Sequence, residues 1–348
     1  MPFAQIEEAI SEIQEGRMVI IVDDEDRENE GDLMVAAEKV TPEAINFMAT
    51  YGRGLICLAM TGQRLDELHI PLMVSDHSNT SPYGTAFCVS IEARSNVSTG
   101  ISAFDRAQTI LTAIDPKTKS NDLARPGHVF PLRACDGGVL VRAGQTEASV
   151  DLAGIAELTP AGVICEIMKE DGTMARVPDL VEFAEQHNLK MITVADLIRY
   201  RLRTERFVHK VGETTLPTPH GNFRMIVFES ILDQQSHIAL VRGSIENGED
   251  VLVRVQTHCL TGHVFDSLAC HCHEQMDRAM EMIAAEGRGV LLYLHEMVRL
   301  RPSTALLEYH GKHGFDPNET IGLRGEQREY GIPGPSYHSP ELQRTLIK

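Results

Sequence analysis

The stretch that decides the fold begins at Met18-Val-Ile-Ile-Val22 and continues directly into Asp23-Asp-Glu-Asp-Arg-Glu-Asn-Glu-Gly-Asp32. The first part is an unbroken apolar, β-branched run, which predicts a buried strand. The second part holds seven carboxylates and one arginine in ten residues. The acids therefore stand where a strand ends and a loop begins, which is where α/β sheets usually bind their ligands.

The acidic segment 23–32 predicts a cation and substrate site. Carboxylates a few ångströms apart raise each other's pKa unless cations or hydrogen bonds compensate, and a divalent cation would do so. Two other interpretations compete. A run of charges is often a solvated loop. A calcium loop that started at Asp26 would place Gly31 correctly, but its last ligand position would be Ala37 instead of a bidentate glutamate. The spacing therefore excludes a calcium loop.

Composition favours a two-domain globular protein that acts on small molecules. The 348 residues exceed what one core usually holds. The net charge of −18 argues against nucleic acid or an anionic membrane as a partner. Residues 1–8 lack the basic flank and apolar core of a signal peptide, and no apolar run approaches the length of a membrane span. We therefore expect a cytoplasmic protein.

Three of the seven cysteines, Cys259, Cys270 and Cys272, fall in one short segment. An odd total with such a cluster suits a reducing compartment and a metal better than a disulfide framework, although reduced core cysteines remain an alternative. Three thiolates and a water are typical of catalytic zinc, and a fourth protein ligand would close the site. Four histidines could supply that ligand: His258, His263, His271 and His273.

Apolar periodicity predicts alternating strands and helices from Ile6 to about Arg203, which indicates one α/β domain with a mixed sheet. Helices are expected at 6–13 and at 102–114, where Ser102 and Asp105 form a capping box. Further strands are expected at 55–60, 85–91, 138–142 and 163–167. The texture then changes, and the predicted domains are 1–205 and 206–348.

The second domain is predicted to be a smaller α+β, zinc-binding domain. Residues 211–221 are turn-rich. Strands are expected at 223–228 and at 289–294, and a strand pair, 238–241 and 251–255, flanks a turn at Asn247-Gly248. A helix is expected at about 273–286.

Three more segments of the first domain have features of sites. His128 lies in the Pro-bounded turn 125–131 and could act as an acid or base, or be an incidental loop histidine. Residues 142–147 join a predicted strand to a helix and offer Arg, Gly, Thr and free helix N–H groups to a phosphate. Glu166 stands in an apolar strand, where a carboxylate is either functional or ion-paired. These features indicate a phosphorylated small molecule, a divalent metal and acid/base residues.

Six spaced segments closely resemble 3,4-dihydroxy-2-butanone 4-phosphate synthase, in the family's order, over nearly all of residues 1–203. They are 23–32, 80–85, 98–102, 125–132, 137–144, and Cys165-Glu166 with 171–176. The resemblance implies conversion of ribulose 5-phosphate to dihydroxybutanone phosphate and formate, a lyase step of riboflavin biosynthesis. It also implies a homodimer with sites near the subunit interface.

The resemblance also implies roles for single residues. Glu28 matches an acidic ligand for a pair of Mg²⁺ or Mn²⁺ ions, and His128 and Glu166 match residues essential for catalysis. Other residues match positions that contact the substrate: Arg27, Asp32, Arg142, Ala143, Gly144, Gln145, Thr146 and Glu166. Hard cations on the sugar oxygens would stabilise an enediolate, and the acids and bases would move protons.

Gln145 departs from the family, which has a metal-binding histidine there. An amide oxygen can ligate Mg²⁺ but cannot titrate and is a weak ligand for softer ions. The sequence therefore predicts weaker metal binding and either lower activity or a shifted metal preference.

The cysteine segment resembles the zinc site of GTP cyclohydrolase II, from about Leu216 through Leu294. Where that family has a glycine-rich segment that contacts GTP, this chain has residues 296–302, and Pro302 removes a donor. Glu326 and Arg328 are the best match for the family's catalytic Asp-x-Arg. We therefore expect a degenerate domain that binds zinc but is impaired toward GTP. Two alternatives are a bifunctional enzyme that also opens GTP to a diaminopyrimidine and a non-catalytic zinc-binding scaffold.

Overall fold

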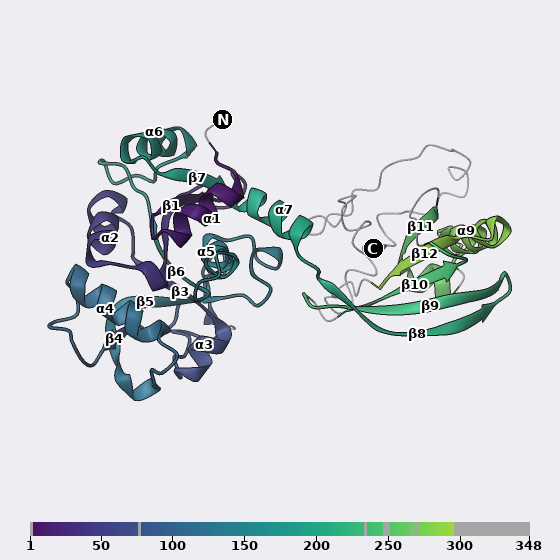
Figure 1. Ribbon diagram of the computed structural model, residues 1–348, viewed down its shortest axis with the longest axis horizontal. Helices are drawn as coiled ribbons and strands as arrows, with labels where there is room; N and C mark the ends of the chain where they lie inside the picture. The colour runs from purple at the N-terminus through teal and green to yellow at the C-terminus, as the bar shows by residue number, and fades with distance from the viewer. Residues whose placement is uncertain are drawn as a thin grey trace. The chain divides into compact units, whose positions relative to one another are not determined.

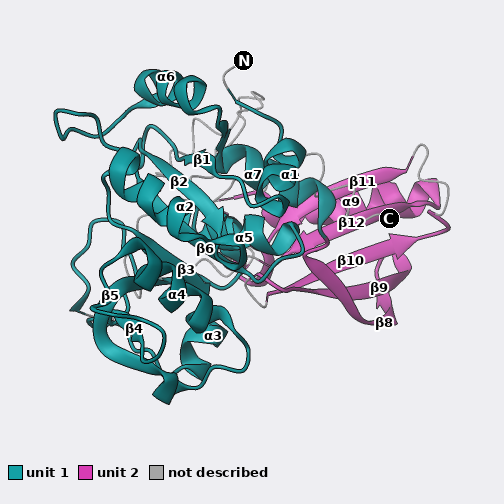
Figure 2. Ribbon diagram, turned by 60° about the vertical axis from the view of Figure 1, so that its left-hand side comes forward, with its two compact units in different colours: residues 1–205, 333–337 teal, residues 206–332, 338–348 magenta. Residues whose placement is uncertain are grey.

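The computed structural model describes residues 3–75, 78–232, 235–245, 251–265, 267–268 and 270–295. These residues fall into two compact units that divide between Glu205 and Arg206 (Figure 2). Each unit has its own sheet and its own hydrophobic core.

Unit 1 is built on a seven-stranded mixed sheet with the order β4-β5-β3-β6-β2-β1-β7. β2 runs antiparallel to β1 and β6, and β3 runs antiparallel to β6, whereas β3 pairs with β5 and β1 with β7 in parallel. The strands are β1 (Val19–Val22), β2 (Gly31–Ala36), β3 (Cys57–Thr61), β4 (Ile91–Ala93), β5 (Leu123–Ala134), β6 (Ala161–Glu166) and β7 (Lys190–Thr193).

Helices cover both faces of this sheet (Figure 1). Side chains alternate between the faces along a strand, so Leu33 of β2 joins one core cluster and Met34 joins the other. One cluster includes α2 (Pro42–Phe47), α3 (Gly62–Glu67), α4 (Ala103–Ile114) and α6 (Val177–His187), and the other includes α1 (Ile6–Gln14), α5 (Gln145–Ile155) and α7 (Val194–Thr204). Because both faces are covered, β1 is buried throughout, as its apolar run predicts. The predicted α/β fold is confirmed.

Several predicted elements of unit 1 are confirmed in detail. α1 and α4 occupy the expected residues, and Ser102 caps α4 by accepting from the Asp105 N–H at 3.0 Å. β6 carries Glu166 as its last residue. Shorter helical turns are η1 (Ala37–Lys39), η2 (Met48–Gly52), η4 (Ser120–Asp122) and η5 (Gly138–Leu140).

Two strand predictions were wrong. Residues 138–142 begin with the 3₁₀ turn η5, because Gly137 and Gly138 have φ values of 92° and 65°, which a strand does not allow. Of residues 85–91, the structure places Ile91 alone in a ladder strand, β4. The Phe87 N–H bonds locally to the Thr85 carbonyl, so this segment forms isolated bridges instead of a continuous ladder.

The turn predicted around His128 was also wrong, because His128 lies inside the long strand β5. A ladder strand normally excludes proline except at an edge or an irregularity. Here the β4–β5 register shifts between Ile91 and Glu92, opposite this segment, which accommodates Pro126.

Unit 2 has a five-stranded sheet with the order β11-β12-β10-β9-β8. Its strands are β8 (Val208–Thr218), β9 (Gly221–Ser230), β10 (Ser236–Arg242), β11 (Leu252–Thr257) and β12 (Gly289–Leu294). α9 (Cys272–Glu286) packs Met280 and Ile283 against Phe223, Leu240 and Leu291, and α8 (Leu260–Val264) follows β11. The predicted α+β class is confirmed.

Two expectations for unit 2 were wrong. Residues 211–221 are mostly strand β8, an edge strand that pairs with β9 and is largely exposed, which explains why its sequence is polar and tolerates proline. β10 and β11 do not pair with each other. The most apolar strand, β12, lies between them, antiparallel to β10 and parallel to β11. The Asn247-Gly248 turn and residues 296–348 lie outside the described residues.

Candidate functional site

The sheet register brings the acidic segment and Glu166 to one edge of unit 1. β1 ends at Val22, which pairs with Gly31 at the start of β2. Asp32 pairs directly with Glu166, the last residue of β6. The loop 23–30 therefore projects from the edge at which Glu166 ends its strand. We call this group, residues 23–32 with Glu166, the acidic edge.

Asp23 organises the loop of the acidic edge. Its side chain is buried, and its two oxygens accept from the Glu30 N–H at 2.9 Å and from the Glu28 N–H at 3.1 Å. It also accepts from Arg27 Nη1 at 2.7 Å. These bonds hold the backbone of the loop at Glu28 and Glu30. Asp23 has no role of its own among the sequence predictions, although its place as the first acid after a buried strand was a usable signal.

Arg27 connects the loop to α5. Its guanidinium contacts Glu28 at 2.7 Å and donates to Gln145 Oε1 at 3.0 Å. Tyr83 donates its hydroxyl to the Arg27 carbonyl at 2.6 Å, and the Tyr83 ring centroid lies 5.2 Å from the guanidinium carbon. Tyr83 is a second contributor, and it lies in the family segment 80–85, for which the sequence predicts no role.

The segment 142–147 meets the acidic edge at the N-terminus of α5. Arg142 pairs with Glu147 at 2.6 Å and donates to the Tyr83 carbonyl at 3.2 Å. Gly144, which follows Ala143, is the N-cap of α5, and a Cβ there would lie 2.6 Å from Arg142 Nη1. Thr146 is buried in the first turn. The N–H groups at this helix start and the two arginines suit an anionic ligand.

Asp32 and Glu166 face each other across β2 and β6. The Glu166 Oε2 atom accepts from the Leu55 N–H at 2.8 Å, and Gly54 lies so close that a Cβ there would meet Oε2 at 2.5 Å. Burial, reinforced by the charges of Glu166 and Glu28, raises the pKa of Asp32 well above its usual range. Asp32 is therefore a buried carboxyl that favours its protonated form.

The other acids of the edge also carry unfavourable charge. Burial is the largest cause of the raised pKa of Glu28, with Asp23 and Glu166 adding to it against the charges of Arg27 and Arg142. Burial and then Glu28 likewise raise the pKa of Glu30, which Arg176 approaches to 3.9 Å. The edge thus has an excess of carboxylate charge that protons or a cation would relieve.

Gln145 occupies the start of α5 beside this charge. Its Oε1 atom accepts from Arg27, whereas its Nε2 atom is buried and has no hydrogen-bond partner among the described residues. A buried amide nitrogen without a partner costs free energy. Glutamine thus leaves one of its polar atoms without a hydrogen bond at this position. Its amide oxygen is a ligand of the kind that hard cations such as Mg²⁺ prefer.

His128 lies toward the same edge but outside this set of contacts. His128 is in β5 and Glu166 ends β6, and β3 lies between these two strands and pairs with both. That separation is two strand spacings, about 10 Å. The His128 ring is 44% exposed and contacts Glu92, with Nδ1 2.5 Å from Oε2.

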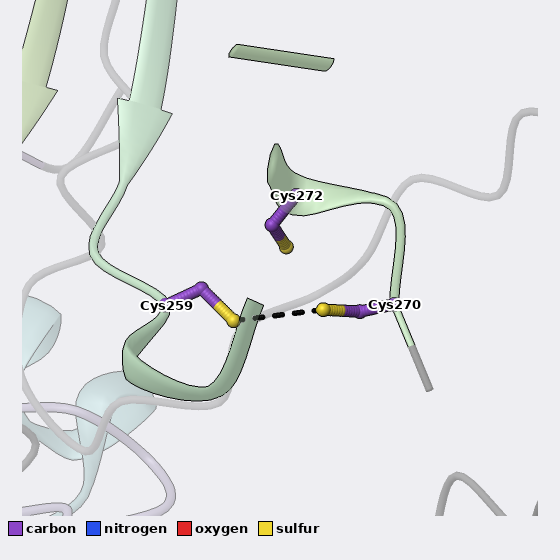
Figure 3. Close-up of side chains that lie close together, drawn as sticks. All are labelled: Cys259, Cys270 and Cys272. Atoms are coloured by element: carbon purple, nitrogen blue, oxygen red, sulfur yellow. Dashed lines mark hydrogen bonds between the residues drawn. The ribbon is translucent and has the colours of Figure 1, made fainter. Parts of the chain in front are cut away.

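Unit 2 holds a compact group of thiols, which we call the cysteine trio: Cys259, Cys270 and Cys272. Their Sγ atoms all lie within 4.8 Å of one another, and Cys259 and Cys270 are 3.8 Å apart. Figure 3 shows the three side chains pointing toward one another. A Cβ at Gly262 would lie 2.6 Å from Cys270 Sγ, so glycine keeps the space between them open. The trio has the geometry of a metal site.

None of the candidate fourth ligands joins the trio within that distance among the described residues. His258 and His263 each place Nδ1 against the Tyr293 hydroxyl, at 2.7 and 3.0 Å. His271 pairs instead with Glu274 at 3.1 Å. Burial, followed by the neighbouring thiols of Cys259 and Cys270, raises the pKa of Cys272 to about 12. Glu326 and Arg328 lie outside the described residues.

Comparison with known families decides the identity of both units. Residues 7–200 match the 3,4-dihydroxy-2-butanone 4-phosphate synthase family, more than half of the chain. The chain belongs to this synthase family. Residues 209–334 match GTP cyclohydrolase II. Both resemblances inferred from the sequence are confirmed at the level of family.

Relatives of the synthase family combine both regions. The chain is 56% identical over 338 residues to the riboflavin biosynthesis protein RibBA of Aquifex aeolicus. The match covers 95% of this chain and 83% of that protein. It is 47% identical over 336 residues to the bifunctional riboflavin biosynthesis protein RIBA 1, chloroplastic, of Arabidopsis thaliana, where the match covers 95% of this chain and 62% of the relative. The chain thus spans less than two thirds of the plant protein.

Solved structures of synthase family members agree with the fold. RibBX, a two-domain 3,4-dihydroxy-2-butanone 4-phosphate synthase from A. baumannii, matches with a TM-score of 0.71 and 42% identity, covering 89% of this chain and 87% of that one. A synthase in complex with two magnesium ions matches with a TM-score of 0.55 and 40% identity, covering 58% and 98%. No helix among the described residues has the length and apolar character to cross a membrane.

Proposed function

We propose that unit 1 converts D-ribulose 5-phosphate to 3,4-dihydroxy-2-butanone 4-phosphate and formate, a lyase step of riboflavin biosynthesis. Family membership supports this reaction. The observation that carries it in the structure is the acidic edge, where Asp32 and Glu166 are paired in register beside the loop that holds Glu28. Glu28, Asp32 and Glu166, whose roles are inferred from the family resemblance, thus lie in separate segments of the sequence but at one edge of the sheet.

The N-terminal turn of α5 is proposed to bind the phosphate. Arg142, Ala143, Gly144 and Thr146 lie at that turn, where the first N–H groups of a helix have no partner within the helix. Arg27 lies at the same place through its contact with Gln145. Guanidinium and helix N–H groups favour phosphate by charge and by hydrogen bonding. This end of the site orients the sugar along the acidic edge.

Asp32, Glu166 and His128 are proposed to move protons. The raised pKa of Asp32, caused by burial and by Glu166, favours a protonated carboxyl that can donate to a sugar oxygen. Glu166 keeps one oxygen on the Leu55 N–H, which orients its carboxylate. His128 lies on β5, which is separated from β6 by β3. Enolisation, dehydration and formate loss each require a proton to be taken up or given.

A divalent cation is proposed to bind beside Glu28. The donor set fits Mg²⁺ or Mn²⁺, since Glu28 offers a carboxylate with an elevated pKa and Gln145 an amide oxygen. Few protein ligands suffice for Mg²⁺, which keeps several waters; two ions per site are expected from the family resemblance. When bound, the cation supplies positive charge to the sugar oxygens. Gln145 is predicted to make this binding weaker than a histidine would.

Formate release tests the proposal. Purified full-length protein with Mg²⁺ is expected to release formate from ribulose 5-phosphate, and Glu28→Gln is expected to lower kcat by about 10²–10³-fold. Glu25→Gln is the matched control, because Glu25 is an exposed acid of the same loop. Absence of formate from the wild type, with the protein folded, would remove the proposed function and leave the scaffold alternative.

For unit 2 we propose a zinc ion bound by Cys259, Cys270 and Cys272, with impaired activity toward GTP. The convergence of the three Sγ atoms within 4.8 Å of one another supports the zinc. Residues 296–302, Glu326 and Arg328 carry the argument for impairment by sequence alone. A GTP-opening assay separates the candidates, since activity abolished by Cys270→Ser would establish the bifunctional alternative. We further propose that the synthase domain spans residues 1–205 and the cyclohydrolase-like domain residues 206–348. The protein is proposed to be a cytoplasmic homodimer.

A further inference from the structure

The strongest contact of His128 is with a residue that no family segment above includes. Glu92 of β4 has its Oε2 atom 2.5 Å from His128 Nδ1, while its side chain is only 17% exposed. A neutral imidazole carries a proton on one ring nitrogen, and the other nitrogen is a hydrogen-bond acceptor. The hydrogen bond made by one nitrogen determines which of the two carries the proton. A carboxylate cannot donate when ionised, so this contact requires the proton on Nδ1.

We propose that Glu92 is a positioning residue that holds His128 in its Nδ1–H tautomer and leaves Nε2 free as the proton acceptor. The inference rests on the proposed role of His128 in proton transfer. The His128 ring is 44% exposed, so Nε2 is available to a substrate or its proton. Glu92 fixes the ring on the strand, in the way that carboxylates orient catalytic and metal-binding histidines.

The structure around Glu92 is built to receive its carboxylate. A Cβ at Gly100 would lie 1.9 Å from Glu92 Oε2, so any larger residue would displace the carboxylate from His128. Gly100 also has φ +90°, a conformation that favours glycine. The position is therefore restricted twice, by backbone conformation and by the volume that Glu92 occupies.

Asp105 holds the turn that contains Gly100. Its two oxygens accept from the Ser98 N–H at 3.1 Å, the Ser98 hydroxyl at 2.7 Å and the Gly100 N–H at 2.9 Å. The hydrogen bonds from Ser98, and then those from Gly100 and Ser102, lower the pKa of Asp105. A short chain of contacts thus runs from the start of α4 through Gly100 and Glu92 to His128.

Kinetics of Glu92 variants test the first consequence. Glu92→Ala is expected to lower kcat by about 10- to 100-fold, the range for loss of a partner that orients a histidine, with KM little changed. Glu92→Gln can still accept a bond from Nδ1–H but can also donate with its amide, so it is expected to fall between Ala and the wild type. Glu92→Asp keeps the charge and is expected to recover part of the loss. Unchanged kcat in Glu92→Ala would overturn the inference.

Gly100→Ala tests the geometry without removing the carboxylate. It is expected to lower kcat in the wild-type background and to add little in the Glu92→Ala background, because the displaced group is already gone. Gly172→Ala is the control, since Gly172 has φ +84° but open space around the added Cβ. It reports the cost of the backbone conformation alone. Equal kcat losses from Gly100→Ala in both backgrounds would contradict the proposal.

A spectroscopic readout separates positioning from general stability. In protein labelled with ¹⁵N-histidine, the His128 signals, assigned by their loss in His128→Gln, are expected to show the Nδ1–H tautomer, and Glu92→Ala is expected to shift the ring toward Nε2–H. A wild-type ring in the Nε2–H tautomer would overturn the inference. Because this readout needs no substrate, it stands even where formate release fails and the proposed function falls.

Discussion

The acidic edge of unit 1 and the cysteine trio of unit 2 are built in opposite ways. The trio comes from one short segment and brings three soft ligands within 4.8 Å of one another. The acidic edge comes from the loop after β1, from the start of β2 and from the end of β6, and its acids form no such three-ligand group among the described residues. Soft thiolates in a tight group suit a firmly held zinc, whereas dispersed carboxylates suit an exchangeable hard cation beside a substrate.

The difference also lies in what each region costs the fold. At the acidic edge, burial and mutual repulsion raise the pKa of Asp32, Glu28 and Glu30, and only part of the charge is met by Arg27 and Arg142. A site that waits for substrate and cation must carry that charge unrelieved. The repulsion among these carboxylates therefore lowers the stability of the folded protein at the proposed catalytic site.

The largest expected effect is on catalysis at the acidic edge. Glu166→Gln is expected to lower kcat for formate release by about 10³-fold, because the amide keeps the size of the side chain but cannot take up a proton. Glu170→Gln is the control, since that side chain is 95% exposed on the following turn. A Glu166→Gln enzyme within twofold of the wild type would place the chemistry elsewhere.

The cysteine trio should respond in metal content instead. Cys270→Ser is expected to reduce zinc from about one ion per chain to a trace after dialysis against a chelator, because two thiolates hold zinc far less tightly than three. Elemental analysis of the purified protein measures this. Cys135→Ser, an exposed cysteine in unit 1, should leave zinc unchanged. Equal loss in both variants, or no zinc in the wild type, would contradict the assignment.

Gln145 offers a way to move the acidic edge toward tighter binding. Gln145→His is expected to raise Mn²⁺ affinity by about 10-fold or more, since imidazole is a better ligand for that ion than an amide. Titration calorimetry measures the affinity, and turnover should rise at limiting metal. Gln145→Leu, which removes the oxygen, should bind more weakly than the wild type. Unaltered affinity in the histidine variant would refute the explanation given for this position.

The smallest expected effect is on stability without metal. The folded-state pKa of Asp32 is raised by burial and by Glu166, so the folded protein holds a proton that the unfolded chain releases above about pH 4. The free energy of unfolding therefore falls as pH rises from there through the raised pKa. Asp32→Asn is expected to remove this slope and to add about 1 kcal/mol at neutral pH.

Urea unfolding followed by circular dichroism is the measurement for Asp32, because the chain contains no tryptophan. The comparison of wild type and Asp32→Asn is made in EDTA at pH 5 and pH 8. A steeper loss of stability with pH in the asparagine variant than in the wild type would reverse the sign and exclude a protonated Asp32.

The sequence predicted the cysteine trio and the acidic edge for different reasons. Cys259, Cys270 and Cys272 are close in the chain, so spacing was sufficient. Glu166 lies far from Asp32 in sequence, and their pairing depends on the β2–β6 register, which periodicity does not specify. Resemblance to the family supplied that link.

Other features depended on tertiary structure alone. Gly138 forms a helical turn because its left-handed backbone and the nearby Asp151 carboxylate exclude a strand, although its neighbours are apolar. Asp23 and Tyr83 make contacts that only the folded loop reveals. No sequence pattern singles out Glu92, whose contact with His128 depends on the fold.

The most direct test of the acidic edge is a crystal of Glu166→Gln soaked with Mn²⁺ and ribulose 5-phosphate. The anomalous signal of manganese should lie at bonding distance from the Glu28 carboxylate, with the phosphate at the N-terminal turn of α5. Manganese and sugar phosphate bound away from Glu28 would contradict the account.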